Sequence, residues 1–230
     1  MGSRHHEPDE VRAKYIAAMG EDLGSLFYIC WNECAWLHLK WAEYLLLFGT
    51  KSERVQLLNK AAPAFFRIVQ DSLWEDVLLH LCRLTDSPQS AGKDNLTVRR
   101  LPSLVREERQ AEIADLVEDL QIKSEFARDW RKRHIAHHDL ALALGKSAKP
   151  LERATREGVD GALAALATLL DAVEIKYTDS TTAYGALSPP GNAEALLCVL
   201  RDGVDAGRAR LDRVRSGQLL PGDFDGKPPI

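Results

Sequence analysis

Residues 64–85 read AFFRIVQDSLWEDVLLHLCRLT, and their apolar positions recur at the three- and four-residue spacing of an α-helix. The apolar face of this predicted helix consists of Phe65, Phe66, Val69, Leu73, Val77, Leu81 and Leu84. A helix with one continuous apolar face is stable in water only when that face packs against other elements. The chain contains no alternating apolar and polar stretch of convincing strand length, so the packing partners are predicted to be helices.

Helical patterns continue on both sides of this segment. Toward the N-terminus, residues 7–48 are predicted to form one long helix or two, with Gly20 and Gly24 as candidate breaks, and Gly49 and Pro63 separate a shorter helix from its neighbours. Toward the C-terminus, helices are predicted over residues 107–120, 124–138, 155–177 and 193–215. The predicted fold class is therefore all-α, a bundle of roughly six to eight helices.

The chain of 230 residues has an ordinary globular composition, with 45% hydrophobic and 28% charged residues. Its formal net charge of −4 excludes a generally basic nucleic-acid coat, so a site for a polyanion must be a local patch. The polar start MGSRHHEPDE lacks the apolar core of a signal peptide. The longest apolar stretch, near Leu45–Phe48, is too short to span a bilayer. We therefore expect a cytoplasmic protein without membrane contact.

Two of the four cysteines, Cys30 and Cys34, are spaced so that they share one face of a helix. This spacing is compatible with a metal-binding or redox pair, but the chain has no CxxC motif and no second pair at zinc spacing. We interpret both as small core residues of a reducing compartment, and we expect neither a metal ion nor a cofactor.

Composition divides the chain into three predicted parts. Residues 1–145 are expected to form the helical core. Residues 150–216 are expected to form a C-terminal helical extension that packs on this core. The Gly- and Pro-rich residues 217–230 are predicted to be a flexible tail.

The densest cationic stretch of the chain is EFARDWRKRHIAHHDL, residues 125–140. It combines four basic residues with three histidines, namely Arg128, Arg131, Lys132, Arg133, His134, His137 and His138. The cations can simply complement the dipole at the C-terminal end of a helix. Alternatively, His134 and His138 share a helix face and can bind a metal ion, although no HExxH-type motif accompanies them.

A third interpretation of this stretch is acid–base chemistry on RNA. Cleavage of a phosphodiester by the neighbouring 2′-hydroxyl needs a proton acceptor that titrates near neutral pH, which histidine provides. It also needs a fixed positive charge, and the guanidinium of arginine can bind two phosphate oxygens at once. Arg131 and His137 are candidates for these roles, but their spacing corresponds to about 240° of helical rotation. The helix must therefore end or bend between them, or a second copy of the chain must complete the pair.

This stretch resembles the motif of the HEPN superfamily, in which a histidine follows an arginine after four to six residues. Arg131-x5-His137 fits the motif, and RKRHIAHHDL has the Arg…Ala-His-x-Asp form found in many members. Two further stretches, DVLLHLCRLTD at residues 76–86 and GKDNLTVRRL at residues 92–101, are similar to the abortive-infection U-type HEPN proteins of bacteria. The resemblance covers residues 73–140, is weaker toward the N-terminus and is absent at the C-terminal end.

The resemblance implies an antiparallel helical core and a homodimer in which the motifs of two chains face each other. It implies a metal-independent ribonuclease in which His137 is the acid–base group and Arg131 binds the phosphate, with His138 and Asp139 in support. It also implies a toxin of phage defence, so that RNA is the expected substrate and a neutralising antitoxin is an expected partner.

Two features depart from the usual pattern of this superfamily. The residue after Arg131 is Lys132, where Asn, Asp or His is commoner. Arg128, Asp129 and His134 offer a second register of the same motif, with an acidic residue in the second position. Many HEPN proteins are inactive as nucleases, so the alternative function is a catalytically silent dimer that binds RNA, a nucleotide or a protein.

Charged residues near the C-terminal end of the predicted helix over residues 64–85 are further candidates for the site. Arg83 and Asp86 are three positions apart and are predicted to pair with each other. The alternative is that an acidic residue of this helix, Asp76 or Asp86, orients Arg131 or His137.

Overall fold

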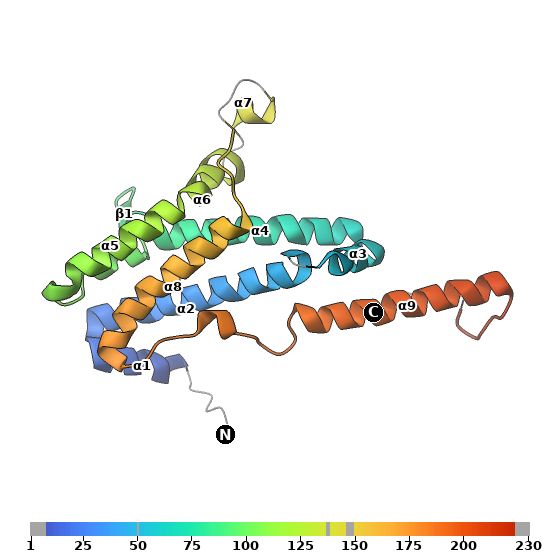
Figure 1. Cartoon of the computed structure of the whole chain (residues 1–230), viewed down its shortest axis with the longest axis horizontal. Helices are drawn as coiled ribbons and strands as arrows, with labels where there is room; N and C mark the ends of the chain where they lie inside the picture. The colour runs from blue at the N-terminus through green and yellow to red at the C-terminus, as the bar shows by residue number, and fades with distance from the viewer. Residues whose placement is uncertain (1–7, 50, 137–138, 146–149, 224–230) are drawn as a thin grey trace. The chain divides into compact units, whose positions relative to one another are not determined.

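The computed structural model describes residues 8–49, 51–136, 139–145 and 150–223, and almost all of its regular structure is helical (Figure 1). Seven helices within these ranges have ten or more residues, so the all-α prediction is confirmed. The α-helices are α1 (Pro8–Met19), α2 (Glu21–Tyr44), α3 (Ser52–Ala61), α4 (Pro63–Thr85), α5 (Glu107–Lys123), α6 (Glu125–Trp130), α7 (Leu140–Ala143), α8 (Arg156–Thr178) and α9 (Ala193–Ser216). No helix among the described residues is long and apolar enough to cross a membrane.

Shorter elements connect these helices. Two wide π turns, η1 (Leu45–Gly49) and η3 (Arg131–Ile135), directly continue α2 and α6. Two 3₁₀ turns are η2 (Val98–Ser103) and η4 (Tyr184–Ala186). Strands β1 (Gln89–Ser90) and β2 (Lys93–Asp94) pair as a small antiparallel hairpin.

Contacts group the chain into two compact units. The first comprises residues 1–41 and 73–187, and the second comprises residues 42–72 and 188–230. The boundaries fall inside α2 and α4, and α8 belongs to the first unit together with α5. This grouping differs from the expected division into a core of residues 1–145 and an extension of residues 150–216. The expected division, with the extension packing on the core, stays a prediction.

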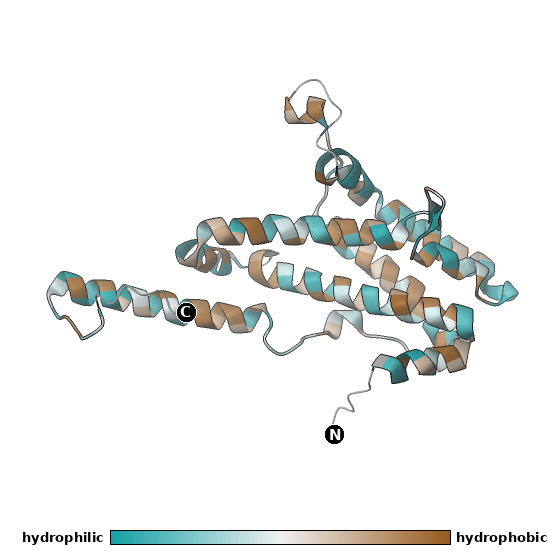
Figure 2. Cartoon of the chain, turned by 180° about the vertical axis from the view of Figure 1, so that it is seen from behind, coloured by the Kyte–Doolittle hydropathy of each residue, from teal (hydrophilic) through white to brown (hydrophobic). Residues whose placement is uncertain are grey.

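The core of the first unit includes the interface between α5 and α8. Apolar side chains buried here come from both helices and from α2 and α4, and include Leu37, Leu78, Leu81, Ile113, Leu120, Leu166 and Leu169. Figure 2 shows that hydrophobic and hydrophilic residues are interleaved along the long helices, as expected for helices with one buried face.

The cysteines of the first unit lie in this core as free thiols. Cys30, Cys34 and Cys82 are all buried and unpaired by disulfides. Burial raises the pKa of the Cys30 thiol to about 12 and that of Cys82 to about 11, so both stay protonated at neutral pH. The prediction that Cys30 and Cys34 are small core residues is therefore confirmed.

In the second unit, α9 packs along α3 and η1. The first backbone amide of α9, Ala193 N, donates to Glu43 Oε2 at 2.6 Å. Beyond the other end of α9, Asp223 accepts a hydrogen bond at 2.6 Å from Nη2 of Arg213. Residues 217–223, the described start of the expected flexible tail, are therefore tied back to α9.

The two glycines predicted as breaks near the N-terminus have different roles. Gly20 has a φ of +86°, which a glycine adopts without strain, and it separates α1 from α2. Gly24 lies within α2, where an added Cβ would be only 2.6 Å from Ile16 Cα and from the Tyr15 carbonyl oxygen. Gly24 therefore allows the backbones of α1 and α2 to approach each other closely.

Replacing Gly24 with alanine is expected to destabilise the protein by about 1–3 kcal/mol, because the new methyl group collides with backbone that cannot move independently. Gly161 is a matched control inside α8, where an added Cβ meets no atom within 4 Å. Gly161→Ala is expected to stabilise the protein by up to about 1 kcal/mol through helix propensity. Urea denaturation measures both changes, and a Gly24→Ala protein as stable as wild type would contradict the close approach.

Candidate functional site

The basic segment begins as α6 and changes its helical geometry at Arg131. Ala136 N donates to Arg131 O at 2.8 Å, five residues back, and Asp139 N donates to Arg133 O at 3.0 Å. Such widened turns occur often at functional sites. The helix that was predicted over residues 124–138 therefore ends at Ile135. A helix end between the arginine and the histidine of the motif was one of the expected alternatives. His137 and His138 lie outside the described residues.

Arg131 forms an ion pair with Asp86, the residue that directly follows α4. Its Nη1 atom lies 2.6 Å from Asp86 Oδ2, and both side chains are about a third exposed, at 32% and 29%. This hydrogen bond raises the pKa of Arg131 further above its ordinary value, so the guanidinium stays charged. The predicted pairing of Asp86 with Arg83 is therefore wrong, and the alternative, an acid that orients Arg131, is what the structure shows. Asp76 pairs with Lys40 instead, at 2.6 Å.

The segment that follows Asp86 fixes the backbone at the end of α4. The Thr97 hydroxyl donates to Leu84 O at 3.0 Å and to Asp86 O at 2.8 Å. Arg100 closes the hairpin by donating to Asn95 O at 3.0 Å. The stretch GKDNLTVRRL therefore packs against the end of α4, next to Asp86. Sequence reasoning found this stretch only as a resemblance and did not assign it a role.

Arg128 of the second register has a structural role. Its guanidinium donates to the hydroxyls of Thr85 at 3.2 Å and Ser124 at 3.1 Å, and to the carbonyl of Gln121 at 3.3 Å. These bonds join the ends of α4 and α5 to α6. Because these bonds and the nearby Glu125 carboxylate, 3.7 Å from Nε, engage most of the guanidinium, Arg128 is less well placed than Arg131 to bind a phosphate group.

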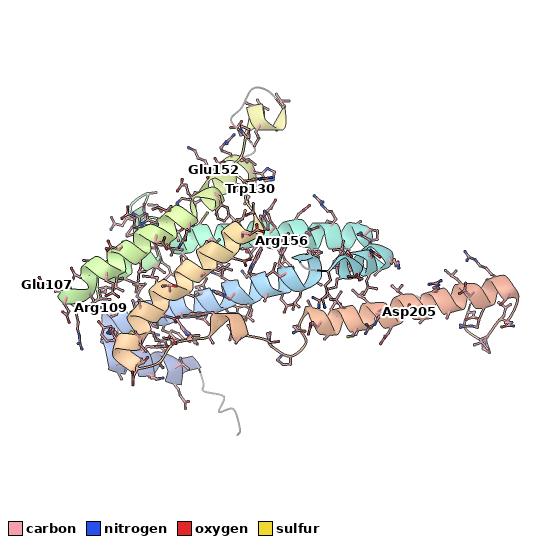
Figure 3. All side chains as sticks on the ribbon, in the orientation of Figure 1. Glu107, Arg109, Trp130, Glu152, Arg156 and Asp205 are labelled. Atoms are coloured by element: carbon pink, nitrogen blue, oxygen red, sulfur yellow. The ribbon has the colours of Figure 1, made fainter. Side chains whose placement is uncertain are left out.

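Asp129 and Trp130 fasten α6 to the segment before α8. Asp129 Oδ2 accepts from Glu152 N at 2.9 Å, and Trp130 Nε1 donates to Glu152 O at 2.8 Å. Figure 3 shows Trp130 and Glu152 side by side next to α6. Asp129 also pairs with Arg133 at 3.3 Å. Asp129, the acidic residue of the second register, therefore binds the backbone of Glu152, a contact that the sequence did not reveal.

The remaining candidates differ in their surroundings. The His134 ring meets the Trp130 ring edge to face, with centroids 5.3 Å apart. Asp139 accepts from the amides of Ala141 at 2.9 Å and Leu142 at 3.1 Å, so it caps the start of α7. Lys132 is exposed, and no ion pair or hydrogen bond connects it to the described residues.

An open groove of about 600 Å³ runs beside these residues. Its lining comprises Glu125, Arg128, Asp129, Arg131, Lys132, Ala136 and Glu152. Arg131 and Lys132 bring positive charge to this groove, and Arg131 is already oriented by its carboxylate partner. No group of three or more potential metal-ligating side chains occurs in the part of the chain that the structure describes, which does not include His137 and His138.

The helical fold and the Arg131 motif at the end of a helix define a HEPN-type protein. The model of the HEPN family AbiU2 matches residues 20–196, and the chain therefore belongs to this family. The match extends beyond residues 73–140 in both directions and includes the whole of α2 and of α8. No curated protein and no solved structure matches the chain significantly.

Proposed function

We propose that this protein is a metal-independent ribonuclease that cleaves RNA by attack of the 2′-hydroxyl on the adjacent phosphate. The observation that carries the proposal is Arg131, a permanently charged guanidinium held 2.6 Å from Asp86 at an open groove. It lies on the π turn that immediately precedes the motif histidine in sequence. An oriented cation beside a titratable group is the minimum that this reaction requires.

In this mechanism Arg131 and Lys132 neutralise the phosphate, and His137 removes the proton from the 2′-hydroxyl. The 2′-oxygen forms a bond to phosphorus while the bond from phosphorus to the 5′-oxygen breaks. A second acid returns a proton to that 5′-oxygen, and His138 or the His137 of a second chain can supply it. The products are a 2′,3′-cyclic phosphate and a free 5′-hydroxyl.

The proposal includes partners that follow from membership in an abortive-infection family. We propose a homodimer in which the two motifs face each other, because a symmetric dimer places two identical helix ends at one interface. We also propose that the enzyme acts as a toxin of phage defence and that an antitoxin neutralises it.

The test is cleavage of a mixed RNA pool by the purified wild-type protein in excess EDTA, with analysis of the product ends. Cleavage is expected to continue in EDTA and to leave cyclic phosphates. Activity that disappears in EDTA and returns with Mg²⁺ would contradict metal-independent chemistry.

A second candidate function is a catalytically silent HEPN protein that binds RNA, a nucleotide or another protein. The groove supports it, since Arg131 and Lys132 can bind a phosphate there, whereas Glu125, Asp129 and Glu152 add negative charge that opposes the charge developing during cleavage. RNA binding without cleavage in the same experiment would support this function.

Asp86→Asn is expected to slow RNA cleavage by about 10²-fold, because the guanidinium loses the charged partner that positions it. RNA binding is expected to be retained or strengthened, because a negative charge beside the phosphate site is removed. Asp76→Asn is a matched control on the same helix, since Asp76 forms an equally short ion pair with Lys40, at 2.6 Å. Equal losses of cleavage in both variants, or weaker RNA binding by Asp86→Asn, would contradict a positioning role.

A further inference from the structure

A second opening in the first unit adjoins Asp86 and has no role in the mechanism above. It has a volume of about 310 Å³ and is lined by Glu33, Arg83, Leu84, Asp86, Asn95 and Leu96. We call it the α2–α4 hollow, after the helices that carry Glu33 and Arg83. Asp86 lines this hollow and its partner Arg131 lines the groove, so the 2.6 Å ion pair joins a residue of one opening to a residue of the other.

The acceptor in the α2–α4 hollow is a fixed carboxylate. Glu33 has 34% of its side chain exposed, and its Oε2 atom lies 2.8 Å from Nε2 of His80, which is 2% exposed. Burial, followed by the nearby Lys40, lowers the pKa of His80 and favours its neutral form. A buried imidazole of this kind restrains the carboxylate. Each carboxylate oxygen can accept two hydrogen bonds, so both oxygens of Glu33 keep capacity for a ligand.

The other walls of the hollow offer a donor and an apolar surface. Arg83 is exposed, and no hydrogen bond or ion pair joins its side chain to the rest of the described chain. Leu96 is 39% exposed and gives the hollow an apolar wall. The side-chain amide of Asn95 is already committed to Ser87 O at 2.8 Å and to Ser90 Oγ at 2.9 Å. The polar groups left for a ligand are therefore those of Glu33 and Arg83.

We propose that the α2–α4 hollow is a base-recognition subsite that takes a guanine base of the RNA. This inference rests on the proposed ribonuclease function. Guanine presents two adjacent N–H donors on its pairing edge, which one carboxylate can accept together, and its O6 and N7 atoms accept from a guanidinium. Glu33 and Arg83 supply this combination, and Leu96 supplies a surface for the face of the ring.

The size and position of the hollow agree with this occupant. Ligand sites usually have volumes of about 300–1,000 Å³, so a hollow at the lower limit suits a single base and not a whole nucleotide. Arg131 of the groove lies 2.6 Å from Asp86 of the hollow, so we expect one nucleotide to place its phosphate in the groove and its base in the hollow.

The test compares base preference in four proteins: wild type, Glu33→Gln, Arg83→Ala and the control Glu118→Gln, which changes an exposed acid of α5. Each is incubated with an RNA pool of randomised sequence, and the cut sites are sequenced. Wild type and Glu118→Gln are expected to prefer guanine beside the cut by about tenfold or more, and both hollow variants are expected to lose this preference. Because Arg83 is exposed, Arg83→Ala tests the hollow without disturbing the core, and circular dichroism checks the fold of each variant.

Binding of guanosine, adenosine, cytidine and uridine 5′-monophosphates is measured in parallel by calorimetry. Cleavage with no base preference, or with a guanine preference that survives in Glu33→Gln and Arg83→Ala, would overturn the base subsite and leave the ribonuclease intact. If wild type cleaves no RNA, the ribonuclease proposal fails, and nucleotide binding decides on the hollow alone. Selective binding of the guanosine nucleotide that is lost in Glu33→Gln would then uphold the hollow as a guanine site, and equal binding of all four would overturn it.

Discussion

Replacing His137 with alanine is expected to lower the rate of RNA cleavage by about 10²–10⁴-fold, the usual contribution of a general acid–base group. Arg131→Ala is expected to cause a loss of about 10²–10³-fold, because the charge that develops on the phosphate is no longer neutralised. Arg131→Lys is expected to restore only part of the activity, since an ammonium group cannot bind two oxygens in the fixed geometry of a guanidinium. Single-turnover cleavage in EDTA measures all three.

His134→Ala is the matched control for this prediction. His134 belongs to the second register and packs edge to face against Trp130 at 5.3 Å. Its replacement is expected to change the cleavage rate by much less than the loss of His137. If His134→Ala is the inactive variant and His137→Ala retains activity, the assignment of the motif is wrong while the ribonuclease proposal stands. Thermal denaturation of each protein separates a chemical effect from a loss of folded protein.

Replacing Arg128 with alanine is expected to destabilise the protein by about 2–4 kcal/mol. The guanidinium is largely buried, with 21% of the side chain exposed, and donates to Thr85, Ser124 and Gln121. Hydrogen bonds to charged groups contribute about 1.5–3 kcal/mol each in proteins, and their acceptors here lose a partner that water replaces only in part. The same guanidinium also complements the carbonyl end of α5. Urea denaturation at neutral pH measures the change.

Lys123→Ala is the control for Arg128, because Lys123 is also a cation at the end of α5. It forms an exposed pair with Asp119 at 2.6 Å, with both side chains 46% exposed, and its loss is expected to cost less than about 0.5 kcal/mol. At a temperature where Arg128→Ala is still folded, its cleavage rate is expected to stay near that of wild type. A stable Arg128→Ala protein without activity would instead assign Arg128 to the chemistry.

The helices of this protein were predictable because their signals are local. Pro63 begins α4 and Gly20 separates α1 from α2, and each acts through its own backbone angles. The Thr155 side chain accepts from Gly158 N at the start of α8, so this boundary is also set within one turn. The family was recognisable for a similar reason, since the order and spacing of short motifs can be compared directly along a chain.

The type of helix within the basic segment, residues 125–140, was less predictable. A regular helix was expected to reach residue 138, but the hydrogen bond from Ala136 N to Arg131 O widens the turn and ends the helix earlier. Propensity scales do not distinguish a π turn from an α-helix, because the same residues favour both and tertiary contacts select between them.

Sequence alone determined which chemical groups are candidates for the site, and the tertiary structure decided which of the described ones lie together. Arg131 and His137 were identified from residue type and spacing, whereas the partner of Arg131 is Asp86, 45 positions away. The same holds for Asp129 and Trp130, which bind the backbone of Glu152 more than twenty positions away. Local geometry favoured a pairing of Asp86 with Arg83 over one with Arg131, since residues three positions apart share a helix face. The fold instead brings the guanidinium of Arg131, just after α6, to 2.6 Å from the carboxylate of Asp86, just after α4. A contact of this kind depends on the whole fold.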